Sequence, residues 1–437
     1  MPARCFLLTI PSLLATLAAA ASAQQWLPSF PPNPSHTGHN FLYGVGAADA
    51  DDAWVVGYSN VETSHGYDQF TLAAHWDGTG WTQAPTPSPG IENWGTKSVL
   101  YAVEAISAEN VWAAGSKTIQ HPVDGAIGQQ LFVLRWTGEQ WDEIETPLTP
   151  AGGTGAWIRD IHAIAPDDIW FVGLFNFAGG GPSTGLALHW DGSGFTLHQT
   201  PNFNIDLEKN LAASVAADGD LWIAGMAGRG GWGMVPYVYR GRGDSWELVG
   251  ELPSPMYTNV QTIVAFADDD AWIAASKSVD GQYLGQFWLH WDGSAWVEHA
   301  VPDPFHVPVL AAFGPDDIYS AGWSSLYHWD GIAWSQVDAF DGVNAPNFAQ
   351  LDAAADGSVF GAGSYFPGGD GLTLAASYTP TTDCPADFND DGDVNTLDVL
   401  AFLNAWNNHE SAADFNNDGT VDTLDVLAFL NAWNAGC

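Results

Sequence analysis

The chain has 437 residues, more than a typical single domain, and its 51 Asp and Glu against 10 Lys and Arg give a formal net charge of −41 at pH 7. A surface this acidic repels polyanions, which excludes nucleic acid and anionic membranes as partners. The 23 tryptophans require a packed interior, which excludes a disordered chain.

The first residues, 1–23, have the pattern of a secretory signal peptide. Arg4 supplies the positive end, residues 6–20 are apolar, and Ala21-Ser22-Ala23 forms a small-residue cleavage site. No later stretch approaches the apolar length that a membrane span needs. We therefore expect a secreted protein, extracellular or attached to the cell surface, that has no membrane span.

Two short signatures repeat through residues 24–380. The first is His-Trp-Asp-Gly followed three residues later by an aromatic side chain, and its copies or variants lie at 75–81, 135–141, 189–195, 239–246, 290–296 and 328–334. The second is Asp-x-Trp-x-x-Gly, and its aromatic position holds Trp54, Trp112, Trp170, Trp222, Trp272, Tyr319 or Phe360. Signatures that recur in this way indicate a repeat array.

Each repeat is predicted to form four short antiparallel strands. In the first repeat these are residues 42–46, 53–58 and 70–76 and a strand that begins at Trp81, with Asp77-Gly78 as the tight turn before it. Trp76 and Trp81 flank this turn, so we expect them to pair across the two strands. Such a unit is one blade of a β-propeller, in which the repeated aromatic and small residues pack between blades.

The last repeat is incomplete. Residues 371–378 match the third strand of the first repeat, but no Asp-Gly turn or fourth strand follows, whereas residues 26–34 resemble the fourth-strand segment 81–89. Pairing the N-terminal strand into the last blade removes the open edges. The sequence therefore predicts an all-β seven-bladed propeller over residues 24–380. The repeats resemble bacterial propellers with Trp-Asp-Gly repeats, of kelch or WD40 type, and this resemblance implies a fold and no particular activity.

The segments between the second and third strands and the connections between blades are predicted to share one end of the propeller, where binding residues usually lie. The segments are 59–69, 116–130, 174–184, 226–235 and 277–285. Together with the connections they carry Tyr67, Trp94, His121, Trp157, Phe175, Phe177, Arg229, Trp232, Tyr257, Tyr283 and His306. Such an aromatic end suits a neutral polymer such as a glycan. The histidines at 75, 189, 290 and 328 are interpreted as interblade packing residues and not as ligands.

No catalytic motif stands out in the propeller. The Asp-Gly turns lack the residue that separates Asp from Gly in the sialidase Asp box, and a glycosidase pair of carboxylates cannot be singled out among so many acids. Three alternatives stay open: a glycan-binding protein, a glycoside hydrolase or polysaccharide lyase, and a structural surface protein. A deep axial pocket with converging carboxylates would favour an enzyme, an aromatic end would favour glycan binding, and a flat polar end would favour the structural role.

The segment 381–437 carries two calcium-loop patterns, at 387–398 and 414–425, each with oxygen side chains at positions 1, 3, 5, 9 and 12 and glycine at position 6. The predicted ligands of two Ca²⁺ ions are Asp387, Asn389, Asp391, Asp393, Asn395, Asp398, Asp414, Asn416, Asp418, Thr420, Asp422 and Asp425, with Asp393 and Thr420 using their backbone carbonyls. A set of oxygen ligands favours Ca²⁺ over transition metals. Each loop leads into the same predicted amphipathic helix, 399–406 and 426–433.

Two such loop–helix units, with Asp at position 12 and no helix before the first loop, resemble a type I dockerin. The framing segments Cys384-Pro385-Ala386 and Ala435-Gly436-Cys437 are similar to the dockerin-like tails that end in Gly-Cys. The resemblance implies docking to a cohesin-like partner or to the cell surface through loop positions 10 and 11, here Thr396-Leu397 and Thr423-Leu424. Because these pairs are duplicated, two symmetric binding modes are expected.

Cys384 and Cys437 are the two cysteines that follow the predicted signal peptide. An even pair outside the cytoplasm favours a disulfide. The alternative is that Cys437 is a free thiol used for anchoring.

Overall fold

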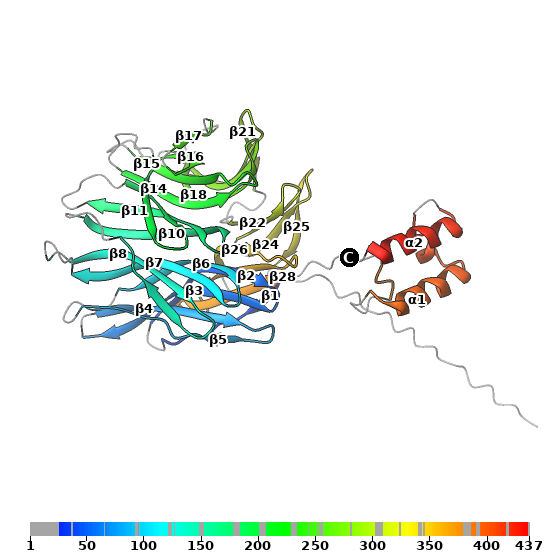
Figure 1. The fold of residues 1–437 in the computed structure, drawn as a ribbon, viewed down its shortest axis with the longest axis horizontal. Helices are drawn as coiled ribbons and strands as arrows, with labels where there is room; N and C mark the ends of the chain where they lie inside the picture. The colour runs from blue at the N-terminus through cyan, green and yellow to red at the C-terminus, as the bar shows by residue number, and fades with distance from the viewer. Residues whose placement is uncertain are drawn as a thin grey trace, which may run out of the picture.

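The computed structural model describes residues 26–35, 38–64, 66–91, 95, 97–120, 125, 127–147, 153–177, 184–200, 207–228, 234–243, 245–250, 252, 257–279, 282–301, 309–322, 325–339, 343, 346–378, 386–389, 394–416 and 419–435. These residues form seven four-stranded antiparallel sheets and a C-terminal pair of α-helices (Figure 1). The all-β seven-bladed propeller with a small helical domain, predicted from the repeats and the two loops, is confirmed. Among the described helices, none is long and apolar enough to cross a membrane.

Each sheet is one blade, and in six of the seven the strands follow chain order from the inner to the outer edge. The first three blades are β2 (Asn40–Asp49), β3 (Asp52–Thr63), β4 (Gly66–Trp76) and β5 (Trp81–Gln83); β6 (Val99–Ser107), β7 (Asn110–Gln120), β8 (Ile127–Trp136) and β9 (Trp141–Ile144); and β10 (Gly153–Ala165), β11 (Asp168–Phe177), β12 (Thr184–Trp190) and β13 (Phe195–Gln199). The next three are β14 (Leu207–Val215), β15 (Leu221–Gly228), β16 (Met234–Arg242) and β17 (Ser245–Leu248); β18 (Tyr257–Ala267), β19 (Asp270–Val279), β20 (Gln282–Trp291) and β21 (Trp296–Ala300); and β22 (Val309–Gly314), β23 (Asp317–Ala321), β24 (Ser325–Trp329) and β25 (Trp334–Ala339).

The seventh blade joins the two ends of the propeller. It consists of β26 (Asn347–Ala353), β27 (Val359–Tyr365), β28 (Leu372–Tyr378) and the N-terminal β1 (Leu27–Ser29), which pairs antiparallel with β28 in the register Leu27 to Ser377. Trp26, 2% exposed, anchors this strand against Phe348 with ring centroids 5.4 Å apart. This is the closure that the likeness between residues 26–34 and 81–89 predicts.

The repeated tryptophans pack as predicted. Trp76 and Trp81 are register partners with ring centroids 5.6 Å apart. Trp54 of the first blade lies 4.9 Å from Trp136 and 5.1 Å from Trp141 of the second blade. The aromatic residue of the Asp-x-Trp-x-x-Gly signature is therefore an interblade packing residue.

The segments predicted to be variable loops are in large part strand. In the first blade β3 and β4 remain paired out to Thr63 and Gly66, so most of the predicted loop 59–69 is a continuous hairpin. The same holds in the second blade, where β7 and β8 pair out to Gln120 and Ile127. Polar residues that alternate on a two-stranded ribbon can satisfy their backbone by cross-strand pairing, so composition alone did not distinguish them from loop.

Six of the seven inner strands carry a β-bulge at the same position. The register skips Tyr43 in β2, Tyr101 in β6, Arg159 in β10, Leu211 in β14, Gln261 in β18 and Ala349 in β26, whereas β22 begins just after this position. In the first three blades the bulge accounts for the signature glycine on the neighbouring strand, whereas the fifth blade has Ala275 at this position. A Cβ on Gly57, Gly115 or Gly173 would lie 1.9, 2.0 or 1.9 Å from a backbone carbonyl oxygen of the bulged strand. A bulge changes the direction in which a side chain points, and here it does so in the inner strand of six blades.

Candidate functional site

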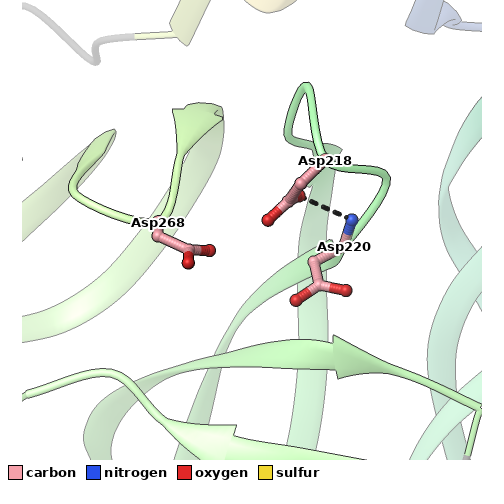
Figure 2. A group of neighbouring side chains, drawn as sticks. All are labelled: Asp218, Asp220 and Asp268. Atoms are coloured by element: carbon pink, nitrogen blue, oxygen red, sulfur yellow. Dashed lines mark hydrogen bonds between the residues drawn. The ribbon is translucent and has the colours of Figure 1, made fainter.

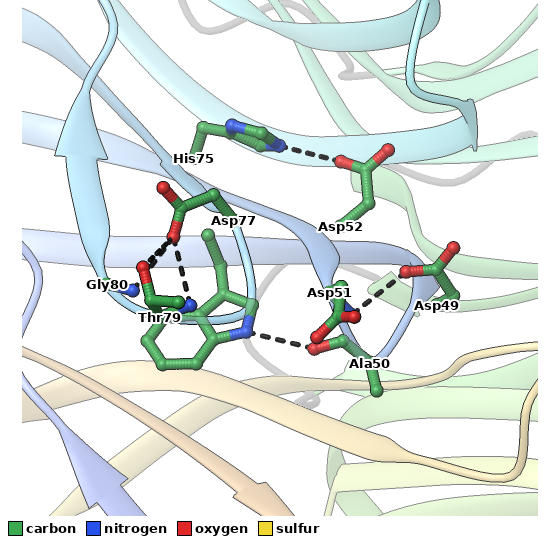
Figure 3. Close-up of polar contacts among 9 residues, drawn as sticks. Asp49, Ala50, Asp51, Asp52, His75, Asp77, Thr79 and Gly80 are labelled. Carbon is green, nitrogen blue, oxygen red and sulfur yellow. Dashed lines mark hydrogen bonds and ion pairs between the residues drawn. The ribbon is translucent and has the colours of Figure 1, made fainter.

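The histidine of the His-Trp-Asp-Gly signature is a structural residue. His75 Nε2 lies 2.7 Å from Asp52 Oδ1 (Figure 3). The His75 ring also stacks on Trp54 with centroids 4.6 Å apart. Equivalent pairs are His189 with Asp168, His290 with Asp270 and His328 with Asp317. Both partners belong to the same blade, and the prediction of a satisfied histidine is confirmed. Packing of these histidines between blades stays a prediction, although the Trp54 ring under His75 does contact the second blade.

The aspartate of the signature shapes its own turn. Asp77 Oδ1 accepts hydrogen bonds from the backbone amides of Thr79 at 2.9 Å and Gly80 at 3.0 Å (Figure 3). The Thr79 hydroxyl also donates to it, and this bond, followed by the amides, holds the pKa of Asp77 below its usual range. Asp191, Asp292 and Asp330 cap the corresponding turns in the same way. These repeated acids stabilise turns and are not candidates for catalysis.

Three aspartates gather between the fourth and fifth blades. The carboxylate oxygens of Asp218, Asp220 and Asp268 lie within 4.8 Å of one another, and Figure 2 shows two of them on one turn facing the third on the next. Arg240 forms an ion pair with Asp268, and the Asp218 carboxyl shares a hydrogen bond with Asp268 that raises the pKa of Asp268. Arg240 already offsets part of this negative charge, so we do not assign a metal site here.

An axial cavity of about 500 Å³ runs between the seven inner strands. Its lining comes from every blade and includes Glu104, Asp160, His162, Ser214, Gln350 and Asp352. The sequence did not predict these residues, because their shared position becomes visible only when the inner strands are aligned by their bulges.

The carboxylates of the cavity tie each blade to the next. Asp352 Oδ2 accepts the amide of Ala47 at 2.7 Å, Glu104 Oε1 that of Ala163 at 3.2 Å, and Asp160 Oδ2 that of Ala213 at 2.9 Å. An inner strand is the edge of its sheet and has unpaired amides, and these side chains satisfy them.

Burial also makes these carboxyls weak acids. Burial, with the nearby charges of Asp352 and Asp160, raises the pKa of Glu104 to about 8. Burial raises the pKa of Asp160 to about 7 and also raises that of Asp352, although backbone amides oppose the shift in both. Burial lowers the pKa of His162 to about 4, so this imidazole is neutral at pH 7.

The opposite, loop-rich end of the inner strands carries a continuous row of rings, which we call the aromatic row. It consists of Phe366, Phe41, Tyr58, Tyr43 and Tyr101, with successive centroids 6.2, 5.4, 5.8 and 5.3 Å apart. The row crosses from the seventh blade through the first to the second. Four of its members are partly exposed and Tyr58 is 9% exposed, so the row is accessible from this end.

Arg159 of the third blade completes the row. Its guanidinium lies over the Tyr101 ring, 4.3 Å from the centroid. Among the residues predicted for this end, Tyr67 is exposed and Trp157 is partly exposed, but Phe175 is buried in the core, so its prediction as a surface binding residue is wrong. Trp94, His121, Arg229, Trp232 and His306 lie outside the described residues, as do the side chains of Phe177, Tyr257 and Tyr283.

The two C-terminal loops are held alike. In the first, the position-12 residue Asp398 accepts the amide of Asn389 at 3.2 Å and that of Asn395 at 2.8 Å. In the second, Asp425 accepts the amides of Asn416 at 3.1 Å and Asp422 at 2.7 Å. Both carboxyls are 0% exposed.

The donor chemistry fits Ca²⁺. Burial acts to raise the pKa of Asp398, but hydrogen bonds from Asn395 and Asn389 outweigh it, and the pKa is lowered. The segment 381–437 contains no Lys or Arg that could balance these buried carboxylates. A divalent cation with oxygen ligands supplies that charge. The individual ligand assignments stay a prediction, and Asp391, Asp393, Asp418, Cys384 and Cys437 lie outside the described residues.

The helices that follow the loops pack as a symmetric pair. Phe402 of α1 (Thr396–Asn407) stacks on Phe429 of α2 (Thr423–Ala435) with centroids 4.2 Å apart, while η2 (Ser411–Ala413) joins the units. The Trp406 indole donates to the Asp422 carbonyl at 2.6 Å, and the Trp433 indole donates to the Asn395 carbonyl at 2.8 Å. The tryptophan of each helix therefore forms a hydrogen bond to the backbone at position 9 of the calcium loop in the other unit.

Each helix also exposes a stripe of leucines. The first stripe is Leu397, Leu400 and Leu403, and the second is Leu424, Leu427 and Leu430; all six are between 41 and 58% exposed. We call these the leucine faces. The predicted docking residues Thr396, Leu397, Thr423 and Leu424 are exposed at the start of these faces. The leucines one and two turns further were missed, although their spacing of three residues in a duplicated helix is visible in the sequence.

The comparisons with known proteins agree with this division of the chain. Residues 385–433 match the family model of the Dockerin type I domain, and this match supports Ca²⁺ as the ion of the loops and docking as the role of the domain. No curated protein matches the chain significantly in sequence.

Solved structures similar to the chain include a protein of unknown function from Dyadobacter fermentans, with 12% identity over 81% of this chain and 98% of that chain and a TM-score of 0.46. A polysaccharide lyase described as a PL25 ulvan lyase has 13% identity over 78% and 92% with a TM-score of 0.46, and Penicillium chrysogenum α-L-arabinanase has 9% over 81% and 96% with a TM-score of 0.45. Likenesses at this level extend to the fold alone. The chain is thus a seven-bladed β-propeller that carries a dockerin type I domain at residues 385–433.

Proposed function

We propose that the protein is a secreted, surface-docked binder of extracellular polysaccharide. Its dockerin type I domain attaches it in the presence of Ca²⁺ to a cohesin-like protein or another cell-surface receptor, and its propeller presents a glycan-binding end. The predicted signal peptide at 1–23 and the match over residues 385–433 support this location and role.

The leucine faces carry the docking part of the proposal. Six leucines are exposed on two short helices of a small domain, whereas its core consists of Phe402, Phe429 and their neighbours. Solvent-exposed apolar stripes of this kind mark interaction surfaces. The stripes are duplicated along with their loops, so the domain offers a partner two equivalent surfaces.

The docking part is tested by binding of the full-length protein to an immobilised type I cohesin domain, with Ca²⁺ or with EGTA. Changing one face, as in L397D/L400D or L424D/L427D, should lower affinity by about twofold, because the other face remains available. Changing both should abolish binding, while Ala412→Asp, an exposed change in η2, should leave it intact. Binding that persists in EGTA, or that one altered face abolishes, contradicts the proposal.

The aromatic row carries the polysaccharide part of the proposal. Sugar rings have apolar faces that pack on aromatic side chains, while tyrosine hydroxyls can bond to sugar hydroxyls. The row extends over three successive blades, from Phe366 after β27 through β2 and β3 to β6, at the end of the propeller that holds the interblade connections. A panel of immobilised polysaccharides probed with the full-length protein tests this part, and Y43A/Y101A should bind the recognised polymer at least about tenfold more weakly.

The axial cavity favours a second candidate, a glycoside hydrolase. Glu104, with a pKa of about 8, is protonated at neutral pH as a general acid must be, and Asp160 and Asp352 lie close enough to influence its pKa. However, each of these carboxyls holds an amide of the adjacent blade. Release of reducing ends from a bound polymer, lost in Glu104→Gln, would establish the hydrolase instead of the binding protein.

A further inference from the structure

We propose that Arg159 binds a carboxylate of the ligand, so that the polysaccharide recognised by the aromatic row contains uronic acid. This inference rests on the proposed glycan-binding function and names the chemical class of its ligand. It departs from the neutral polymer that the composition favours.

Arg159 is held at the end of the aromatic row by the fold itself. It is the bulge residue of β10, as Tyr43 and Tyr101 are the bulge residues of β2 and β6. The three equivalent positions of adjacent blades are in contact, since Tyr43 lies 5.3 Å from Tyr101 and the Arg159 guanidinium lies 4.3 Å from the Tyr101 centroid. The bulge that the three inner strands share therefore brings the rings of Tyr43 and Tyr101 and the guanidinium of Arg159 into contact.

Arg159 Nε is buried and makes no hydrogen bond within the described part of the chain. The Nε atoms of the other described arginines all donate: Arg135 to Asn110, Arg240 to Glu247 and Arg242 to the Gly219 carbonyl. A buried donor without an acceptor costs stability, and fixed donors of this kind are suited to a ligand that supplies the acceptor.

The charge distribution along the inner strands is uneven. The three cavity carboxyls, Glu104, Asp160 and Asp352, bond to backbone amides of the neighbouring blades and give Arg159 no ion pair. Arg159 is the only arginine in the seven inner strands, where it is the bulge residue of β10. The only lysine in these strands is Lys209, which lies two residues before the bulge of β14. In a chain with 51 acidic residues, the described part thus shows no ion pair to its one inner-strand arginine.

The tyrosines beside Arg159 suit binding better than proton abstraction. Burial raises the pKa of Tyr43 and of Tyr101, and the positive charge of Arg159 only partly offsets this in each. Both hydroxyls therefore remain protonated at neutral pH and can donate to or accept from sugar hydroxyls. The planar guanidinium pairs with a planar carboxylate through two parallel hydrogen bonds, whereas a neutral sugar offers no charge to match it.

The test uses the full-length protein at one fixed Ca²⁺ concentration and short oligogalacturonates, their carboxyl-reduced counterparts and a sulfated neutral oligosaccharide. Titration calorimetry should show binding of the oligouronate at least about tenfold tighter than binding of its reduced form. In Arg159→Gln the oligouronate and its reduced form should bind equally, and binding of the reduced form should be retained. Arg159→Lys keeps the positive charge but lacks the two parallel N–H donors of the guanidinium, so it should lower the affinity ratio only in part. Arg135→Gln is the matched control, because Arg135 also lies over a ring, that of Trp112, and should leave the ratio unchanged.

The outcomes separate this inference from the proposed function. Equal binding of the oligouronate and its reduced form by the wild type, or an unchanged ratio in Arg159→Gln, overturns the carboxylate assignment and leaves a glycan-binding propeller. Tighter binding of the sulfated sugar than of the oligouronate overturns it in favour of a sulfate ligand. Binding of none of the three overturns the inference together with the proposed function. If Arg159→Gln melts much below the wild type, the ratio measured for Arg159→Lys decides between these outcomes.

Discussion

At the scale of single residues, Gly57, Gly115 and Gly173 each face a backbone carbonyl of a bulged inner strand, although the fifth blade has Ala275 at the equivalent position. A Cβ on Gly115 would lie 2.0 Å from the Val99 carbonyl oxygen, which belongs to the backbone and cannot move aside. We expect Gly115→Ala to lower the free energy of unfolding by at least about 2 kcal/mol, since a buried overlap forces the two strands apart. Chemical denaturation measures this loss.

Gly80→Ala provides the control for that substitution. This glycine lies in an exposed turn, a Cβ added to it would meet no atom within 4 Å, and its φ is not positive. If Gly80→Ala and Gly115→Ala lost the same free energy of unfolding, the close approach of the bulged strand would not be the reason that residue 115 is glycine.

Glu104 should make the stability of the propeller depend on pH. Its pKa is raised from 4.5 to about 8, so the protonated form is favoured by folding. The resulting stabilisation is fully present below pH 4.5 and is lost as the pH rises through about 8. Glu104→Gln cannot ionise and still offers an acceptor to Ala163, so between these limits its stability should fall less steeply than that of the wild type.

Denaturant midpoints measured across this pH range test the assignment. Glu109→Gln, in an exposed turn, should follow the wild-type profile. Parallel profiles for Glu104→Gln and the wild type would mean that the carboxyl does not change its protonation on folding.

At the scale of strands and helices, β1 is the element on which the ring depends. Its anchor Trp26 is 2% exposed, whereas Leu27 beside it is 53% exposed. Trp26→Ala should therefore cost about 3–5 kcal/mol of stability, as expected for truncating a buried tryptophan, and Leu27→Ala should cost less than about 1 kcal/mol. Thermal melts of the two variants that shift equally would contradict the anchoring role of Trp26.

The repeats in the sequence predict most of the strands. They predict only some of the residues of the candidate site. The strand 81–83 and the closing strand near Trp26 can be predicted from patterns that recur in the sequence, because every blade packs against its neighbours with the same types of residue. The bulge at Tyr43 cannot be predicted from these patterns, since a bulge depends on how two strands pair and not on the sequence of one strand alone. The contact of Arg159 with Tyr101 joins separate blades, and no local pattern encodes it.

At the scale of the whole molecule, the two calcium loops should act as one unit. Removal of Ca²⁺ from the full-length protein should unfold α1 and α2, because the buried Asp398 and Asp425 carboxylates lose their counter-charge. Circular dichroism at 222 nm should show a loss in EGTA that Ca²⁺ restores, while the aromatic near-ultraviolet signal of the propeller remains. Helicity that survives excess EGTA contradicts the dependence on Ca²⁺.

The crossed tryptophan contacts should couple the two ion sites. Trp406 bonds to the carbonyl of Asp422 and Trp433 to that of Asn395, each in the loop of the other unit. Trp406→Phe keeps the packing and removes one bond, so it should weaken binding at the second loop and make the Ca²⁺ titration less cooperative. Trp433→Phe should do the same to the first loop, and an unchanged titration in both variants would show that the loops are independent.

The pairing of β1 with β28 also sets an order of events during synthesis. The ribosome delivers Leu27–Ser29 at the start and its partner Leu372–Tyr378 only after the intervening blades. A nascent chain that stalls inside any of those blades remains an open arc with unpaired strand edges. Because the dockerin type I domain follows β28, a chain that contains this domain already contains all the strands of the ring, so under the proposed docking role an incomplete propeller lacks the docking domain.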